Sequence, residues 1–260
     1  MHPTVAARLA RLSPDQHAAA TAPQGPVLCV APAGSGKTTT LVARVAWRID
    51  AGTAPEGMCA LTFNRRAADE LRSRLDEALA PLCSDAGAVR VRTFHALGRE
   101  ILRDAGLAVE PLLDRLEVIM GLAGGPLPPP VLRRLDDAFS RLKLDAGFDR
   151  DRARVELAAL ATTRTSGIGP TDTERMSTLE AFVAYEAALA RQGGLDFDDL
   201  VARANRALAL DPALLERWRA RCRALFVDET QDLDRSQLAL ACLLAAPAND
   251  LFLVGDDDQP

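Results

Sequence analysis

The chain has 260 residues, 48% of them hydrophobic and 26% charged, which suffices for one large domain or two ordinary ones. No apolar stretch reaches membrane-spanning length and the N-terminus lacks the apolar centre of a secretory signal, so we expect a cytoplasmic protein with no membrane partner. The net charge of −5 does not exclude a nucleic-acid partner, because the acidic excess is concentrated after residue 225.

The first predicted helix begins at Ser13-Pro14-Asp15-Gln16. Ser13 fits the N-cap position, Pro14 the first helical position, and Gln16 can return a hydrogen bond to close a capping box. Further along the chain, five scattered cysteines form no CxxC pair. They indicate buried free thiols rather than a zinc site or a disulfide framework.

A glycine-rich loop follows, between an apolar strand over 27–31 and a helix over 39–50. A strand that ends in such a loop and continues as a helix directs backbone N–H groups and the positive helix end at one point, which suits a triphosphate. Lys37 would reach the β- and γ-phosphates and the Thr38 hydroxyl would hold Mg²⁺. The sequence therefore predicts a Mg²⁺-ATP site at Ala31, Pro32, Ala33, Gly34, Ser35, Gly36, Lys37, Thr38 and Thr39.

Strands and helices alternate through the next segment. A strand over 58–63 precedes a helix over 65–80, and a strand over 89–92 precedes a helix that ends near 104. This alternation predicts an α/β fold with a parallel sheet of the P-loop type. The first segment of the ATP-binding domain is therefore expected at 1–104.

The strand signal disappears between 105 and 194, where leucine-rich helical stretches are broken by glycine and proline clusters. We expect an inserted all-helical subdomain there. The α/β pattern resumes over 195–260, with strands at 224–227 and 251–254, and this range is the expected second segment of the ATP-binding domain.

Two acidic motifs follow these last strands. Asp228 and Glu229 come directly after the first of them, where an acid lies beside Mg²⁺ in P-loop folds and an adjacent glutamate can activate water. The loop after the second strand carries three acids that would repel a nucleotide unless a cation were near, so Gln259 is the better candidate for contacting the γ-phosphate. The alternative for Asp228 and Glu229 is a strand followed by a helix that these acids cap. The alternative for the loop after the second strand is an acidic terminal turn.

The motifs LSPDQ, APAGSGKT, LTFNRRAADEL, VRTFHALGREIL, LDFDDLV, FVDETQD and VGDDDQP occur in this order from Leu12 to Pro260. The set resembles the UvrD/Rep/PcrA-type superfamily 1 DNA helicases. The resemblance implies a RecA-like fold interrupted by a helical subdomain. It also implies a 3′–5′ DNA helicase that couples Mg²⁺-ATP hydrolysis to translocation on single-stranded DNA and to unwinding at duplex junctions.

The resemblance also implies roles for individual residues. Gln16 resembles the adenine-reading glutamine of the family, whereas its local alternative is the capping box. The box at 196–199 has no role that we can derive beyond helix capping. Two further motifs resemble family segments that contact single-stranded DNA, although the family more often has Thr-Asn-Lys where this chain has Asn-Arg-Arg. Their residues are Phe63, Asn64, Arg65, Arg66, Thr93, Phe94 and His95.

Alternatives remain for two of these residues: Phe63 as a core residue and His95 as a local hydrogen-bonding group. The family also needs a second RecA-like domain, whose arginines close over the γ-phosphate. The 260 residues end inside the motif that begins at Gly255, so we expect that domain outside them, and weak nucleotide binding without unwinding by these residues alone. Rival functions are the motor of a RecB- or AddA-type helicase–nuclease and a nucleotide-gated DNA-binding module without turnover.

Overall fold

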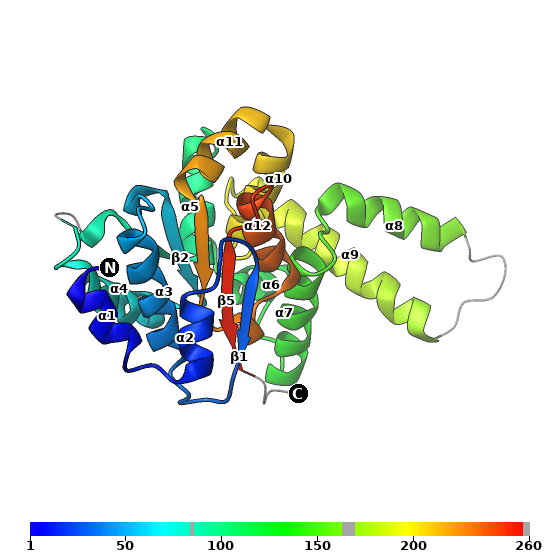
Figure 1. Cartoon of the computed structure of the whole chain (residues 1–260). Helices are drawn as coiled ribbons and strands as arrows, with labels where there is room; N and C mark the ends of the chain where they lie inside the picture. Colours follow the sequence, from blue (N-terminus) through cyan, green and yellow to red (C-terminus); the bar gives the residue numbers. More distant parts are fainter. Residues whose placement is uncertain (84–85, 163–169, 257–260) are drawn as a thin grey trace. The chain divides into compact units, whose positions relative to one another are not determined.

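The computed structural model describes residues 1–83, 86–162 and 170–256, and these residues form two compact units. Unit 1 comprises Met1–Leu97 and Ala207–Pro260, and unit 2 comprises Gly98–Arg206 (Figure 1). The segment expected to be an inserted subdomain, 105–194, lies within unit 2. The segment 195–206, which we assigned to the ATP-binding domain, belongs to unit 2 as well.

The described part of unit 1 is built on a five-stranded parallel sheet with the strand order β1-β5-β4-β2-β3. Neighbouring strands are separated in the sequence, so each connection crosses over the sheet, as parallel pairing requires. This arrangement confirms the α/β fold class predicted from the alternation of strands and helices. The strands are β1 (Val27–Val30), β2 (Met58–Thr62), β3 (Arg90–Thr93), β4 (Ala224–Val227) and β5 (Leu251–Gly255).

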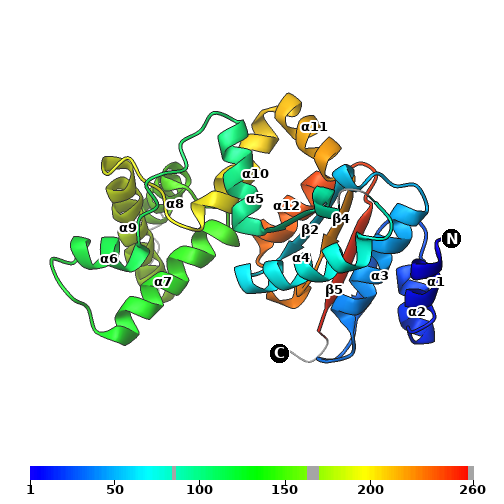
Figure 2. The same cartoon turned by 90° about the vertical axis from the view of Figure 1, so that its left-hand side faces the viewer.

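Helices cover both faces of this sheet, with α3 and α4 on one face and α12 on the other (Figures 1 and 2). The core under α3 and α4 is apolar: Leu41, Leu71 and Leu75 are buried against Phe226 and Phe252 of the central strands. Burying each such side chain contributes about 1.5–3 kcal/mol. The helices of unit 1 are α1 (Pro3–Leu9), α2 (Pro14–Ala20), α3 (Lys37–Asp50), α4 (Arg65–Leu79), α11 (Pro212–Arg221) and α12 (Arg235–Ala245).

Unit 2 is helical, as predicted for its central part. Its core is centred on three aromatic rings: the centroids of Phe139 and Phe182 are 5.5 Å apart, and those of Phe139 and Tyr185 are 5.0 Å apart. The helices are α6 (Arg115–Leu122), α7 (Pro129–Leu144), α8 (Arg150–Thr162) and α9 (Pro170–Arg191). Two more, α5 (Phe94–Asp104) and α10 (Asp199–Leu210), begin in one unit and end in the other.

All five cysteines are free thiols, as predicted, but their burial differs from the prediction. Cys59 and Cys222 are buried, whereas Cys242 is exposed. The prediction is wrong for Cys242 because α12 buries Leu240 and Leu244 and leaves this residue on its outer face. Within the described ranges, none of the helices is both long enough and apolar enough to cross a membrane.

Candidate functional site

The glycine-rich loop lies where the sequence predicts it, between the end of β1 at Val30 and the start of α3 at Lys37. Gly34 and Gly36 have φ angles of 75° and 85°, a backbone conformation that glycine adopts without a steric penalty. The loop therefore turns tightly enough for the N-terminus of α3 to face the carboxyl end of the sheet. The Ser35 Oγ atom is buried without a hydrogen-bond partner in the described chain. The loop thus has the properties of an anion-binding site.

The Lys37 side chain lies across this loop. Its Nζ atom donates hydrogen bonds to the carbonyl oxygens of Ala31 and Pro32, both at 3.1 Å, and forms an ion pair with the Asp256 carboxylate. Asp256 follows β5, and the last residue of β5, Gly255, pairs with Val30 of β1. The sequence predicts that the acids in the loop after β5 need a nearby cation. Lys37 of the glycine-rich loop is that cation.

A hydroxyl and a carboxylate meet beside the lysine. Thr38 Oγ1 donates to Asp228 Oδ2 at 3.0 Å, and the Asp228 N–H donates to the Leu61 carbonyl at 2.9 Å. Burial raises the pKa of Asp228, and the charge of Glu229 adds to this, while the Thr38 hydrogen bond opposes it. A divalent cation here would favour the ionised carboxylate. The two oxygen atoms suit Mg²⁺, which prefers hard oxygen ligands. The remaining ligands of such an ion are usually oxygen atoms of water and phosphate.

Glu229 is held in an unusual backbone conformation. Its φ of 56° lies in the left-handed region, and its N–H donates to Asp228 Oδ1 at 3.1 Å. The Gln231 side chain donates from Nε2 to Glu229 Oε2 at 2.7 Å and accepts at Oε1 from the Asp256 N–H at 2.9 Å. No role was predicted for Gln231 from the sequence. Its place in the motif FVDETQD is the sequence feature that could have indicated a role.

Gln16 forms the capping box and also contacts the glycine-rich loop. Its Oε1 atom accepts from the Ser13 N–H at 2.9 Å, and its Nε2 atom donates to the Ser35 carbonyl at 2.6 Å. A side-chain amide has two donors and two acceptor sites, so one of each remains. The capping role therefore does not compete with the adenine role, which stays a prediction.

A buried arginine joins α2 to α3 and so helps to position Gln16. The Arg44 guanidinium of α3 donates to the carbonyl oxygens of Ala20 at 3.3 Å and Pro23 at 2.9 Å, at the end of α2. It lies 5.2 Å from the centre of the Trp47 ring. Burial, followed by the charge of Arg48, lowers its pKa to about 10, so it remains charged at neutral pH.

The comparisons with known proteins cover nearly the whole chain. The model of the UvrD/REP helicase N-terminal domain matches residues 12–260. The chain belongs to the UvrD/Rep helicase family. It is 35% identical to ATP-dependent DNA helicase UvrD2 of Mycobacterium tuberculosis over 273 residues, covering 96% of this chain and 37% of that protein. It is 30% identical to DNA helicase II of Escherichia coli over 260 residues, covering 95% of this chain and 34% of that protein.

Another relative is ATP-dependent DNA helicase PcrA of Bacillus subtilis, 28% identical over 267 residues, which are 96% of this chain and 33% of that protein. The chain thus spans about a third of the length of the curated relatives it matches.

The first helicase motif expected to contact DNA is exposed. Phe63 follows β2 and is 44% exposed, so the alternative of a core phenylalanine is wrong. Asn64 caps α4 by accepting from the Ala67 N–H at 2.9 Å. Arg65 and Arg66 are exposed in the first turn of α4, next to Phe63 in the sequence. An aromatic ring, two cations and a helix N-terminus are therefore available to solvent at this edge of the sheet.

The second such motif is mostly buried. Thr93 caps α5 by accepting from the Ala96 N–H at 3.1 Å, and it pairs with Thr62 in the sheet, so the two motifs follow neighbouring strands. Phe94 is fully buried and His95 is 9% exposed. The prediction that Phe94 contacts DNA is therefore not supported in this conformation, because its ring belongs to the core. A DNA role for Thr93 and His95 stays a prediction.

The remaining predicted nucleotide residues divide into two groups. Pro32, Ala33, Gly34 and Thr39 are exposed around the loop, where a ligand can reach them. Gln259 lies outside the described residues, three positions after Asp256 in the sequence.

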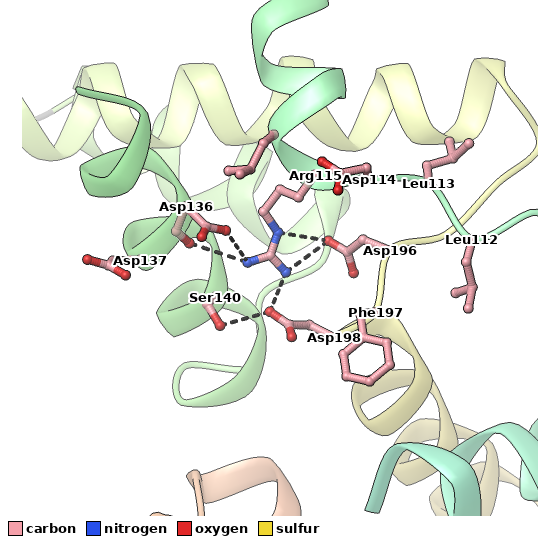
Figure 3. Close-up of a pocket in the computed structure, with 11 residues that line it drawn as sticks. Leu112, Leu113, Asp114, Arg115, Asp136, Asp137, Ser140, Asp196, Phe197 and Asp198 are labelled. Carbon is pink, nitrogen blue, oxygen red and sulfur yellow. Dashed lines mark hydrogen bonds and ion pairs between the residues drawn. The ribbon is translucent and has the colours of Figure 1, made fainter. Parts of the chain in front are cut away.

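The family box at 196–199 belongs to an ionic network in unit 2 (Figure 3). Arg115 donates to Asp196 Oδ2 at 3.1 Å and pairs with Asp198, which also accepts from the Ser140 hydroxyl at 2.8 Å. These groups line an open pocket of about 590 Å³. Lys143, 2% exposed, lies 2.8–3.0 Å from three carboxylates, those of Glu186, Asp196 and Asp199.

Two cations, Arg115 and Lys143, hold four carboxylates in this network, those of Glu186, Asp196, Asp198 and Asp199. Burial alone would raise the pKa of Asp196, but Lys143 and Arg115 lower it to about 2. Burial raises the pKa of Tyr185, whose hydroxyl donates to Asp196 at 2.5 Å. Because the carboxylates of the box are held by buried cations and hydroxyl groups of the neighbouring helices, we interpret the box as a scaffold that holds the start of α10 against α6, α7 and α9.

Proposed function

We propose that the chain is the ATP-binding N-terminal part of a UvrD-like 3′–5′ DNA helicase. It would couple Mg²⁺-ATP hydrolysis to translocation on single-stranded DNA and to duplex unwinding. The observation that carries the proposal is the gathering of Lys37, Thr38, Asp228 and Glu229 at the carboxyl ends of β1 and β4, which flank β5. Ligands bind at this edge in open parallel sheets.

The loop residues bind the triphosphate in this proposal. The N–H groups at the start of α3 and the Lys37 ammonium contact phosphate oxygens, and Lys37 exchanges its Asp256 partner for phosphate. Thr38 and Asp228 would hold Mg²⁺, which neutralises charge that develops on the β- and γ-phosphates. Gln16 is proposed to contact the adenine edge with its remaining donor and acceptor.

Glu229 is the proposed general base. Its carboxylate takes a proton from water while the water oxygen attacks the γ-phosphorus and the bond to the β-phosphate oxygen breaks. Gln259 is proposed to contact the γ-phosphate. Arginines of a second RecA-like domain, proposed to lie in the two thirds of the relatives' length that this chain does not span, would stabilise the transition-state charge.

Exchange of Glu229 for glutamine tests the hydrolytic function in the full-length protein that carries this chain. Glu229→Gln keeps the shape and a hydrogen-bonding oxygen but removes the base, so Mg²⁺-ATP should still bind while DNA-stimulated kcat falls about a hundredfold or more. The measurement is steady-state phosphate release with and without single-stranded DNA. Equal kcat values would remove Glu229 from the mechanism, and a parent that binds ATP and DNA without hydrolysis would favour the nucleotide-gated module.

Exchange of Phe63 for alanine tests the DNA path. The exposed ring can stack on a base, and such stacking contributes about 1–3 kcal/mol per base. Phe63→Ala should weaken single-stranded DNA binding by that amount in a fluorescence titration. Thermal stability should change little, because the ring is not part of the core. Unchanged DNA affinity would contradict the stacking role.

A further inference from the structure

The Gln231 side chain connects the proposed base to the loop after β5. We infer that Gln231 is a positioning residue: it orients the Glu229 carboxylate and couples this orientation to the ion pair between Lys37 and Asp256. The inference rests on the proposed function, since it concerns the same site. It goes beyond that function by assigning a role to a residue that does not contact the phosphates.

The first argument is the conformation of Glu229. A residue with a side chain is strained in the left-handed region, and it persists there only where its surroundings hold it. Three hydrogen bonds do so here: the Glu229 N–H donates to Asp228, the Asp232 N–H donates to the Glu229 carbonyl, and the Gln231 amide donates to Glu229 Oε2 at 2.7 Å. The bond from Gln231 fixes the direction of the carboxylate itself.

The second argument is the close packing between η4 (Thr230–Asp232) and the end of β5. A Cβ atom on Gly255 would lie 2.4 Å from Thr230 Oγ1 and 3.2 Å from Gln231 Oε1. A side chain at position 255 would push η4 away. Glycine therefore permits the approach at which Gln231 Oε1 accepts from the Asp256 N–H at 2.9 Å.

These contacts form a continuous path through one site. Lys37 pairs with the Asp256 side chain, the Asp256 backbone donates to Gln231, and Gln231 donates to Glu229. When Lys37 binds phosphate, Asp256 loses its partner. Because Gln231 bonds the backbone of that same residue, any displacement of Asp256 is transmitted to the base. The orientation of Glu229 thereby depends on the occupancy of the phosphate loop.

A double-mutant cycle in the full-length protein tests the inference. Gln231→Leu removes the polar atoms and leaves a slightly shorter apolar side chain, and it should lower kcat about 10- to 100-fold with KM for Mg²⁺-ATP changed less than about threefold. In a Glu229→Gln background the same exchange should lower kcat less than about twofold, because the group it positions is absent. Gln192→Leu, an exposed glutamine directly after α9, is the matched control and should behave as the parent.

An equal fold-decrease of kcat in the parent and in the Glu229→Gln background would show a merely structural role and overturn the inference. An unchanged kcat for Gln231→Leu would also overturn it. If that variant does not fold, Gln231→Glu provides the second test. It keeps the shape but replaces the Nε2 donor with a carboxylate oxygen, so it should lower kcat about 10-fold or more in the parent and less than about twofold in the Glu229→Gln background. An unchanged kcat, or an equal decrease in both backgrounds, would again overturn the inference. Absence of hydrolysis by the parent would instead refute the proposed function itself.

Discussion

The variant Lys37→Ala is expected to lose measurable Mg²⁺-ATP binding. Its side chain supplies the positive charge over the loop, and truncating a buried charge-paired group costs about 2–5 kcal/mol. Asp256 would also remain beside the phosphates without its cation and repel them. Gly34 and Gly36 keep the turn, and alanine suits a helix start, so the fold should persist. Isothermal titration with Mg²⁺-ATP measures the effect.

The control for this variant is Arg11→Ala, which removes one exposed positive charge from the segment between α1 and α2. It should bind Mg²⁺-ATP as the parent does. Undiminished affinity of Lys37→Ala, with a circular dichroism spectrum like that of the parent, would refute the assignment of the phosphate loop.

The variant Lys143→Met is expected to destabilise unit 2 by about 3–5 kcal/mol, because it leaves Glu186, Asp196 and Asp199 buried without their shared cation. Urea denaturation measures the loss, and hydrogen exchange of peptides from α7 and α9 locates it. Arg175→Met is the matched control: it breaks an exposed pair with Glu156 in the same unit, which contributes about 0–1 kcal/mol.

The loss of stability in Lys143→Met should also depend on pH. Burial raises the pKa of Glu186 and Lys143 opposes this, so without Lys143 the folded variant takes up a proton at higher pH than the unfolded chain and its penalty shrinks as the pH falls. In the parent, the pKa of Asp196 is lowered to about 2, so its contribution is present above pH 4 and is lost toward pH 2. The difference between parent and variant should therefore be larger at pH 7 than at pH 4. A difference of under 1 kcal/mol at pH 7 would contradict the role of Lys143.

Local signals predicted most of unit 1 because each of its elements is short and regular. The strand before the glycine-rich loop and the strand before Asp228 both end within one residue of the prediction, since apolar runs bounded by turn residues specify buried strands. The alternation of strands and helices also predicted the parallel sheet. Phe94 was misjudged because a motif does not record which side of a helix faces the core.

The sequence by itself determined the glycine-rich loop between a strand and a helix, the two strand-terminal acids and the family, because each of these depends on residue types at fixed local spacing. Only the tertiary structure decided what those residues contact. Asp256 meets Lys37, Gln231 joins Glu229 to Asp256, and Lys143 serves three carboxylates, since each contact joins elements whose approach depends on packing rather than on sequence distance. Both lysines of the chain thus bind carboxylates: Lys37 at a site that its neighbours in the sequence predict, and Lys143 at one that the fold alone creates.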